Sequence, residues 1–136
     1  MLASMTRHAT DLTNPDLVAF WTERHLCSVS TVNPDGSLHV TPMGVVIEPA
    51  AGLAWAITSR ISLKARNLSD GGPVAACQID GRWWSTISGH AEVVDDPEVV
   101  AEAERRYAER YRTPRENPER VALRITVDKV LANLPR

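Results

Sequence analysis

The chain has 136 residues and a formal net charge of -2, and 43% of its residues are apolar while 24% are charged. This composition is typical of one globular domain with a sizeable core, and it excludes a strongly basic nucleic-acid-binding chain. No apolar run approaches the length of a bilayer span, so no membrane association is expected. We expect a single cytoplasmic domain over residues 14–136, after a disordered lead-in over residues 1–13.

Start signals predict two longer helices. Asn14-Pro15-Asp16 combines an N-cap residue, a proline at the first helical position and an acid in the first turn. The apolar spacing that follows predicts a helix that ends near His25. The same signal recurs at residues 95–98 and predicts a second helix that ends at about Arg112.

Six strands are predicted from apolar alternation and from turn signals such as the one at residues 33–36. The predicted strands span residues 26–32, 37–46, 53–59, 74–80, 83–94 and 120–131. Pro42 and Gly44 interrupt the second of them, which indicates a bulge or a close approach to the backbone. Because tight turns join most of these strands, the predicted class is mostly β: a six-stranded antiparallel barrel with peripheral helices.

Hydroxyl-bearing and cationic residues are densest at residues 57–68, at the end of the third strand and directly after it. Ser62 is a good N-cap, which would put Lys64 in the first helical turn, where the helix dipole disfavours a cation. A cation placed there indicates an anion, and hydroxyls, free amides, Arg60 and Lys64 together fit a phosphate group. From spacing alone, a solvated basic helix start on the surface remains an alternative.

Other reaction classes have no support in the sequence. There is no nucleophile elbow, Walker loop or pair of Cys or His ligands, so neither a metal site nor a catalytic side chain is predicted. Cys27 and Cys77 lie in apolar runs and are predicted to be buried free thiols. Few acids and bases are placed for catalysis, which fits a protein whose cofactor carries the chemistry.

Two segments resemble a known family. Residues 58–68, followed by residues 74–78 and by a Trp-bearing strand with Ser88-Gly89-His90-Ala91, resemble the pyridoxamine 5'-phosphate oxidase-like FMN-binding split barrels. Residues 106–121, with the pattern Arg-Tyr-Arg-x-Pro-Arg, are similar to the actinobacterial branch that uses the deazaflavin coenzyme F420. The resemblance spans residues 14–131. It implies a homodimeric split barrel with cofactor sites at the interface, and hydride transfer from the reduced coenzyme.

Carried over position by position, the resemblance also implies a cofactor site. Arg60, Ser62 and Lys64 would hold the cofactor phosphate, with Asn67 near them. The remaining residues would lie beside the ribityl chain (Ile57, Thr58, Ser59), along the ring (His39, Thr41, Pro42, Met43) or on neighbouring strands, in either subunit (Gln78, Trp83, Trp84).

Arg112 and Arg115 lie in a loop that prolines would hold. They are interpreted as anion-recognition residues, for a polyglutamate cofactor tail or for substrate carboxylates. A solvated, arginine-rich helix face is the alternative.

Three functions remain open. The first is an F420-dependent reductase of a small, flat, conjugated substrate such as a biliverdin-like tetrapyrrole. The second is an FMN-dependent oxidase or reductase on the same fold. The third is a flavin-, F420- or haem-binding carrier without turnover.

Overall fold

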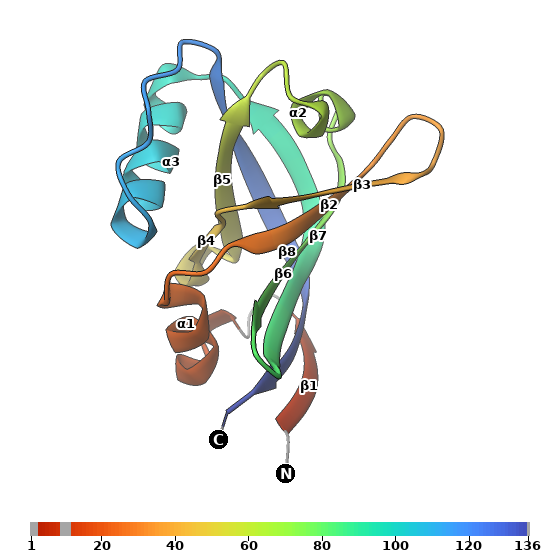
Figure 1. Ribbon diagram of the computed structural model, residues 1–136, viewed down its shortest axis with the longest axis vertical. Coiled ribbons are helices and arrows are strands. Elements are labelled where there is room, and N and C mark those ends of the chain that lie inside the picture. The colour runs from red at the N-terminus through yellow and green to blue at the C-terminus, as the bar shows by residue number, and fades with distance from the viewer. Residues whose placement is uncertain (1–2, 9–11, 136) are drawn as a thin grey trace.

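The computed structural model describes residues 3–8 and 12–135, which form a curled antiparallel sheet with helices on its outside (Figure 1). Every strand pairing in it is antiparallel. The elements, in chain order, are β1 (Ala3–His8), α1 (Pro15–Thr22), β2 (Cys27–Val32), β3 (Leu38–Met43), β4 (Val46–Glu48), a 3₁₀ turn (Pro49–Ala51), β5 (Leu53–Ser59), α2 (Leu63–Asn67), β6 (Gly72–Asp80), β7 (Trp83–Val94), α3 (Pro97–Arg110) and β8 (Arg120–Leu134).

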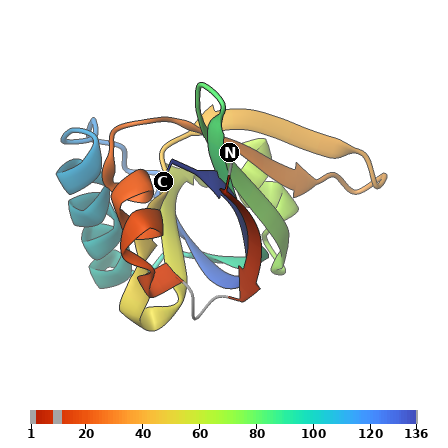
Figure 2. The same ribbon diagram turned by 90° about the horizontal axis from the view of Figure 1, so that it is seen from below.

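The strand order shows how the sheet closes. It runs β3-β2-β6-β7-β8-β5-β4, and β1 pairs with β8 beside this path. β3 and β4 therefore lie at opposite edges, yet only Gly44 and Val45 separate them along the chain. The sheet must curl until its two edges meet, and Figure 2 shows this curl from below. The expected antiparallel barrel-like architecture is confirmed.

The predicted number of six strands is wrong, because the described residues contain eight. The second predicted strand, residues 37–46, is divided at Gly44 into β3 and β4, which pair with different neighbours. Residues 3–8, expected to be part of a disordered lead-in, form β1 along β8. Residues 1–2 and 9–11 of that lead-in lie outside the described residues. The bounds of β5 and β7 are as predicted.

Polar side chains cap the three α-helices as the sequence predicts. Asn14 Oδ1 accepts from the backbone N–H groups of the first turn of α1, and Asp96 Oδ1 does so in α3. Ser62 Oγ accepts from the N–H of Ala65 at 3.1 Å. None of the helices in the described part of the chain is long and apolar enough to cross a membrane.

Two apolar clusters fix the helices against the sheet. The main cluster fills the inside of the curled sheet and includes Leu17, Phe20 and Trp21 of α1. Trp21 Nε1 donates to Ser85 Oγ at 3.0 Å within this core, so its polar atom is satisfied. A smaller cluster of Trp55, Ala103 and Ala122 holds α3 against β5 and β8. Packing in this way brings the C-terminal end of α3 to the point where β3 passes into β4.

Candidate functional site

A cavity of about 370 Å³ lies where β3 passes into β4, beside the C-terminal end of α3. It brings residues predicted to lie along the cofactor, Pro42, Met43 and Ile57, together with Arg112 and Arg115. We call it the arginine cavity; it is lined by Leu26, Pro42, Met43, Gly44, Ile57, Tyr107, Arg112, Pro114, Arg115 and Arg120.

Two of its arginines have no partner in the part of the chain that the structure describes. The side chains of Arg112 and Arg115 are exposed and make neither an ion pair nor a hydrogen bond there. Arg120, in contrast, pairs with Glu104 at 2.9 Å and donates to the backbone oxygen of Arg115 at 2.6 Å. Arg120 thus fixes the loop, while Arg112 and Arg115 remain able to bind an anion.

A second cavity, of about 280 Å³, adjoins the first and is called here the side cavity. The two share Leu26, Tyr107 and Arg112, so these residues separate one space from the other. The side cavity is lined by Arg24, His25, Leu26, Tyr107, Tyr111 and Arg112.

Two stacked tyrosines support this part of the site. The rings of Tyr107 and Tyr111 have centroids 5.0 Å apart and an interplanar angle of 28°. Tyr111 Oη donates to the backbone oxygen of His25 at 2.7 Å and accepts from Val45 N at 3.2 Å. Burial raises the pKa of Tyr111 to about 12. A Cβ on Gly44 would lie 2.7 Å from Tyr111 Cε2 and 2.9 Å from Tyr107 Cε2, so the predicted close approach to this backbone is confirmed.

The predicted phosphate end of the site contains a half-buried cation. Lys64 Nζ donates to Thr41 Oγ1 at 3.2 Å and has no carboxylate partner among the described residues. Partial burial lowers the pKa of Lys64. On the same strand as Thr41, His39 has a buried Nδ1 without a hydrogen-bond partner among those residues. Lys64 and His39 can therefore each still form a hydrogen bond, which fits a phosphate-bearing ligand along β3.

The other residues predicted near the phosphate already have partners. Thr58 Oγ1 donates to Ser62 Oγ at 3.0 Å, and that oxygen also caps α2. Arg60 Nε pairs with Glu119 Oε2 at 2.8 Å. Asn67 Nδ2 donates to two side chains of the β2–β3 hairpin. Of the two cations predicted to contact the phosphate, Lys64 is the one without a carboxylate partner in the described chain.

Gln78 was predicted to contact the cofactor, and this is wrong. Its side chain is fully buried, Nε2 donates to the backbone oxygen of Phe20 at 2.7 Å, and Oε1 accepts from Arg110. Trp83 packs against the main core, and Trp84 follows on the opposite face of β7. Both tryptophans begin β7 at the end of the sheet opposite α2 in Figure 1, so within one chain they lie away from Lys64.

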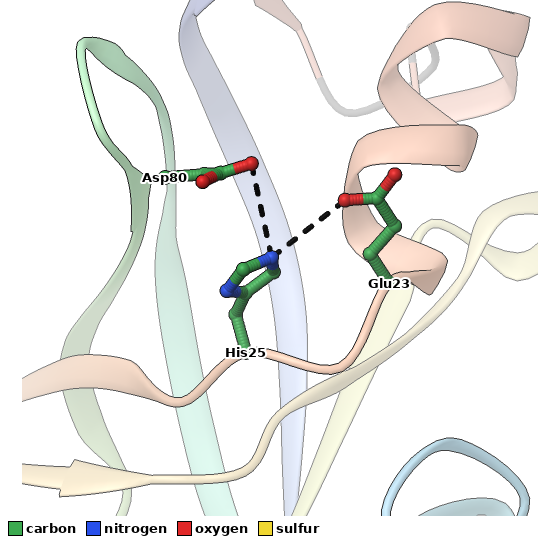
Figure 3. A group of neighbouring side chains, drawn as sticks. All are labelled: Glu23, His25 and Asp80. Carbon is green, nitrogen blue, oxygen red and sulfur yellow. Dashed lines mark ion pairs between the residues drawn. The ribbon is translucent and has the colours of Figure 1, made fainter.

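A cluster of one histidine and two carboxylates lies beside the side cavity. His25 Nε2 is 3.6 Å from Glu23 Oε2 and 3.9 Å from Asp80 Oδ2, and its ring points toward these carboxylates and away from α3 (Figure 3). All three ligand-type atoms lie within 4.8 Å of one another. A histidine between two carboxylates, all partly exposed, is a common ion-pair arrangement, and here it fixes the loop between α1 and β2.

Sequence reasoning did not assign Tyr107, Tyr111 or Arg110 to the site. The two tyrosines lie in the helix that was predicted to end at about Arg112. Arg110 donates to the backbone oxygens of Val45 and Glu23 and to Gln78, which ties α3 to the β3–β4 connection, the end of α1 and β6. A signal was present in the sequence, since two tyrosines one helical turn apart in an arginine-rich segment are unusual for a solvated helix end.

Comparisons with known proteins agree with this geometry. Residues 13–133 match the family described as pyridoxamine 5'-phosphate oxidase. The chain is 39% identical over 126 residues to the F420H(2)-dependent biliverdin reductase of Mycobacterium tuberculosis, covering 93% of this chain and 92% of that protein.

Solved structures share the fold. A conserved hypothetical protein of Mycobacterium tuberculosis has a TM-score of 0.75 at 24% identity, with 91% of this chain and 89% of that chain covered. A structure described as an F420 reductase has a TM-score of 0.62 at 21% identity, with 86% and 92% covered. The family match over most of the sequence and the relative of nearly equal length confirm the resemblance, and the chain belongs to the pyridoxamine 5'-phosphate oxidase family.

Proposed function

We propose that this protein is an oxidoreductase that uses reduced coenzyme F420 to reduce a flat, conjugated, anionic substrate of the biliverdin type. The observation that carries the proposal is the 39% identity, over nearly the whole chain, to an F420H(2)-dependent biliverdin reductase. The site supports it, because cations without a carboxylate partner among the described residues lie beside β3. Lys64 contacts Thr41, and Arg112 and Arg115 line the cavity at Pro42 and Met43.

The residues present fit such a coenzyme. Lys64 would bind the phosphate, and the backbone from His39 to Met43 would face the polar edge of the ring. When bound, the coenzyme supplies the hydride. Pro42, Met43 and Ile57 would exclude water from the reacting face, and Arg112 and Arg115 would bind carboxylates.

The proposal includes a homodimer. Val32 and Leu38 pair across the β2–β3 hairpin, and with Val40 they are exposed at 37%, 67% and 53%. Exposed apolar side chains gathered on one hairpin are typical of an interface. A second subunit on this face would lie along β3, whose Thr41 and Met43 side chains are on the opposite face of the strand.

An FMN-dependent enzyme is the second candidate, because the matched family is described by its pyridoxamine 5'-phosphate oxidase. FMN also carries a phosphate for Lys64. The two candidates differ in the cofactor that binds tightly and in the reductant that supports turnover.

The test is a titration of the purified protein with F420 and with FMN, followed by an absorbance assay of biliverdin reduction by reduced F420. We expect tighter binding of F420 and turnover that depends on it. Tighter FMN binding, with no turnover supported by reduced F420, would reject the proposal in favour of the second candidate.

A further inference from the structure

The inference concerns the substrate side of the site and rests on the proposed function. Along β3, Thr41 contacts Lys64, and two residues further Met43 lines the arginine cavity. In F420 the ring and the acidic tail are attached on opposite sides of the phosphate. With the phosphate at Lys64 and the ring along β3 toward Met43, the tail would leave away from the arginine cavity. That cavity is then the place where a substrate can meet the ring.

Tyr107 has a hydroxyl in this cavity that is available for hydrogen bonding. Its ring lines the arginine cavity and the side cavity and reaches the backbone at Gly44, next to Met43. Its hydroxyl makes no hydrogen bond to any residue that the structure describes. The stacked Tyr111 differs in this respect, since its hydroxyl bonds to His25 and Val45. Within one pair of tyrosines, one hydroxyl is structural and the other is available.

We propose that Tyr107 is a substrate-binding residue: its ring forms the aromatic wall for a flat conjugated substrate, and its hydroxyl donates a hydrogen bond to that substrate. Arg112 and Arg115, on the same cavity, bind the substrate's carboxylates rather than the coenzyme tail. A planar ring next to a donor and two unpaired guanidinium groups is the chemistry that recognises a conjugated dicarboxylate.

Stacking on Tyr111 holds the Tyr107 side chain, and so its hydroxyl donor, in position. The Tyr111 hydroxyl is bonded to two backbone groups, so the ring of Tyr107 packs against a fixed neighbour. Gly44 leaves no room for either ring to move toward the β3–β4 connection. The Tyr107 side chain therefore meets its ligand largely preorganised.

The experiment compares Tyr107→Phe, Tyr107→Leu and Tyr111→Phe with the wild type. Biliverdin is titrated without coenzyme by absorbance, F420 affinity and thermal stability are measured separately, and kcat and KM are determined with reduced F420. We expect Tyr107→Phe to raise the Kd and KM for biliverdin about threefold to tenfold, the effect of one lost hydrogen bond. Tyr107→Leu should raise them further because the aromatic wall is lost as well. F420 affinity should stay unchanged in both variants. The Tm should stay unchanged in Tyr107→Phe, which keeps the stacked ring, and fall in Tyr107→Leu, which loses it.

Tyr111→Phe is the matched control, because it also removes one hydroxyl from the stack. It should lower the Tm, and because its ring still stacks on Tyr107, biliverdin affinity should fall less than in Tyr107→Phe. Wild-type biliverdin affinity in Tyr107→Phe and Tyr107→Leu would overturn the inference and leave the proposed function standing. A wild type that neither binds nor reduces biliverdin would reject the proposed substrate, and this inference with it.

Discussion

Lys64 Nζ lies 3.2 Å from Thr41 Oγ1, and this contact joins the short helix α2 to strand β3. A half-buried ammonium whose one described bond goes to a neutral hydroxyl is incompletely compensated, which is why burial lowers its pKa. An anionic ligand would restore the missing charge partner. The contact therefore marks the phosphate end of the proposed coenzyme site.

Lys64→Ala should weaken F420 binding about tenfold to a hundredfold, because a charge-assisted contact to a phosphate contributes roughly 1.5–3 kcal/mol. The measurement is a fluorescence titration of F420. Arg105→Ala is the control, since it removes one positive charge from an exposed helix face where Arg105 pairs with Glu102 and Glu109. Equal affinities in both variants and the wild type would show that Lys64 is only a solvated cation.

The Arg112→Ala, Arg115→Ala double variant should bind biliverdin more weakly and F420 unchanged. Exposed ion pairs contribute about 0–1 kcal/mol each and are screened by salt. The wild-type Kd for biliverdin should therefore rise with ionic strength, and this rise should shrink in the variant. The control is an Arg105→Ala, Arg124→Ala variant, which loses the same charge from arginines that are already paired. A loss of F420 affinity instead would assign the two arginines to the coenzyme tail.

Much of the fold followed from local signals. Asn14, Asp96 and Ser62 cap their helices as predicted, because a cap depends on a few neighbouring residues. The bounds of β5 and β7 followed from apolar patterning and adjacent turns. β1 depends on pairing with β8 near the other end of the chain, which a single sequence does not encode locally. β4 pairs with the adjacent β5 while β3 pairs with β2, so the break at Gly44 depends on how the whole sheet closes.

The site was predicted less completely than the fold. Pro42, Met43, Ile57, Arg112 and Arg115 were all singled out, and the cavity does bring them together. The partners of individual side chains were not predictable, because they come from tertiary packing. The resemblance implied that Gln78 lies near the cofactor in either subunit, whereas its side chain is buried between Phe20 and Arg110. Tyr107 was predicted only to lie in a helix, whereas it lines two cavities.

Gly89→Ala should destabilise the protein by about 3–5 kcal/mol, as expected when a substitution meets backbone that cannot move. Gly89 lies at the register shift between β7 and β8, and a Cβ there would be 1.8 Å from the backbone oxygen of Thr126. The measurement is urea unfolding at equilibrium. Ser88→Ala, one residue earlier, should change the free energy of unfolding by less than about 1 kcal/mol. A small loss of stability in Gly89→Ala would mean that the backbone of the β7–β8 bulge shifts easily to make room for the added methyl group.

The protein should be a dimer at micromolar concentration, with an apolar interface that buries more than about 2,000 Å² in total. Val40→Lys should shift it toward the monomer, because Val40 is 53% exposed next to the exposed Leu38 end of the hairpin. Light scattering coupled to size-exclusion chromatography measures the mass. Val40→Leu, which keeps the apolar surface, should remain dimeric. A monomeric wild type would remove the proposed second subunit from the site.

Alkaline pH should lower the free energy of unfolding, and ionisation of Cys27 should account for part of this decrease. Burial raises the pKa of the Cys27 thiol from 9.0 to about 11. Burial also raises the pKa of the Tyr111 hydroxyl, to about 12. The unfolded chain therefore loses these protons at lower pH than the folded one. The stabilising effect is fully present below about pH 9 and is lost as the pH rises through the folded pKa.

Each such group lowers the free energy of unfolding by about 1.4 kcal/mol per pH unit in that window. For Cys27 the loss should reach roughly 2–3 kcal/mol between pH 9 and pH 11. Urea unfolding at pH 8 and pH 10.5 measures it, and Cys27→Ala should show a smaller decrease than the wild type. Cys77→Ala is the control, because Cys77 is only half-buried. If Cys27→Ala loses as much stability with pH as the wild type does, the buried thiol is not the group that titrates.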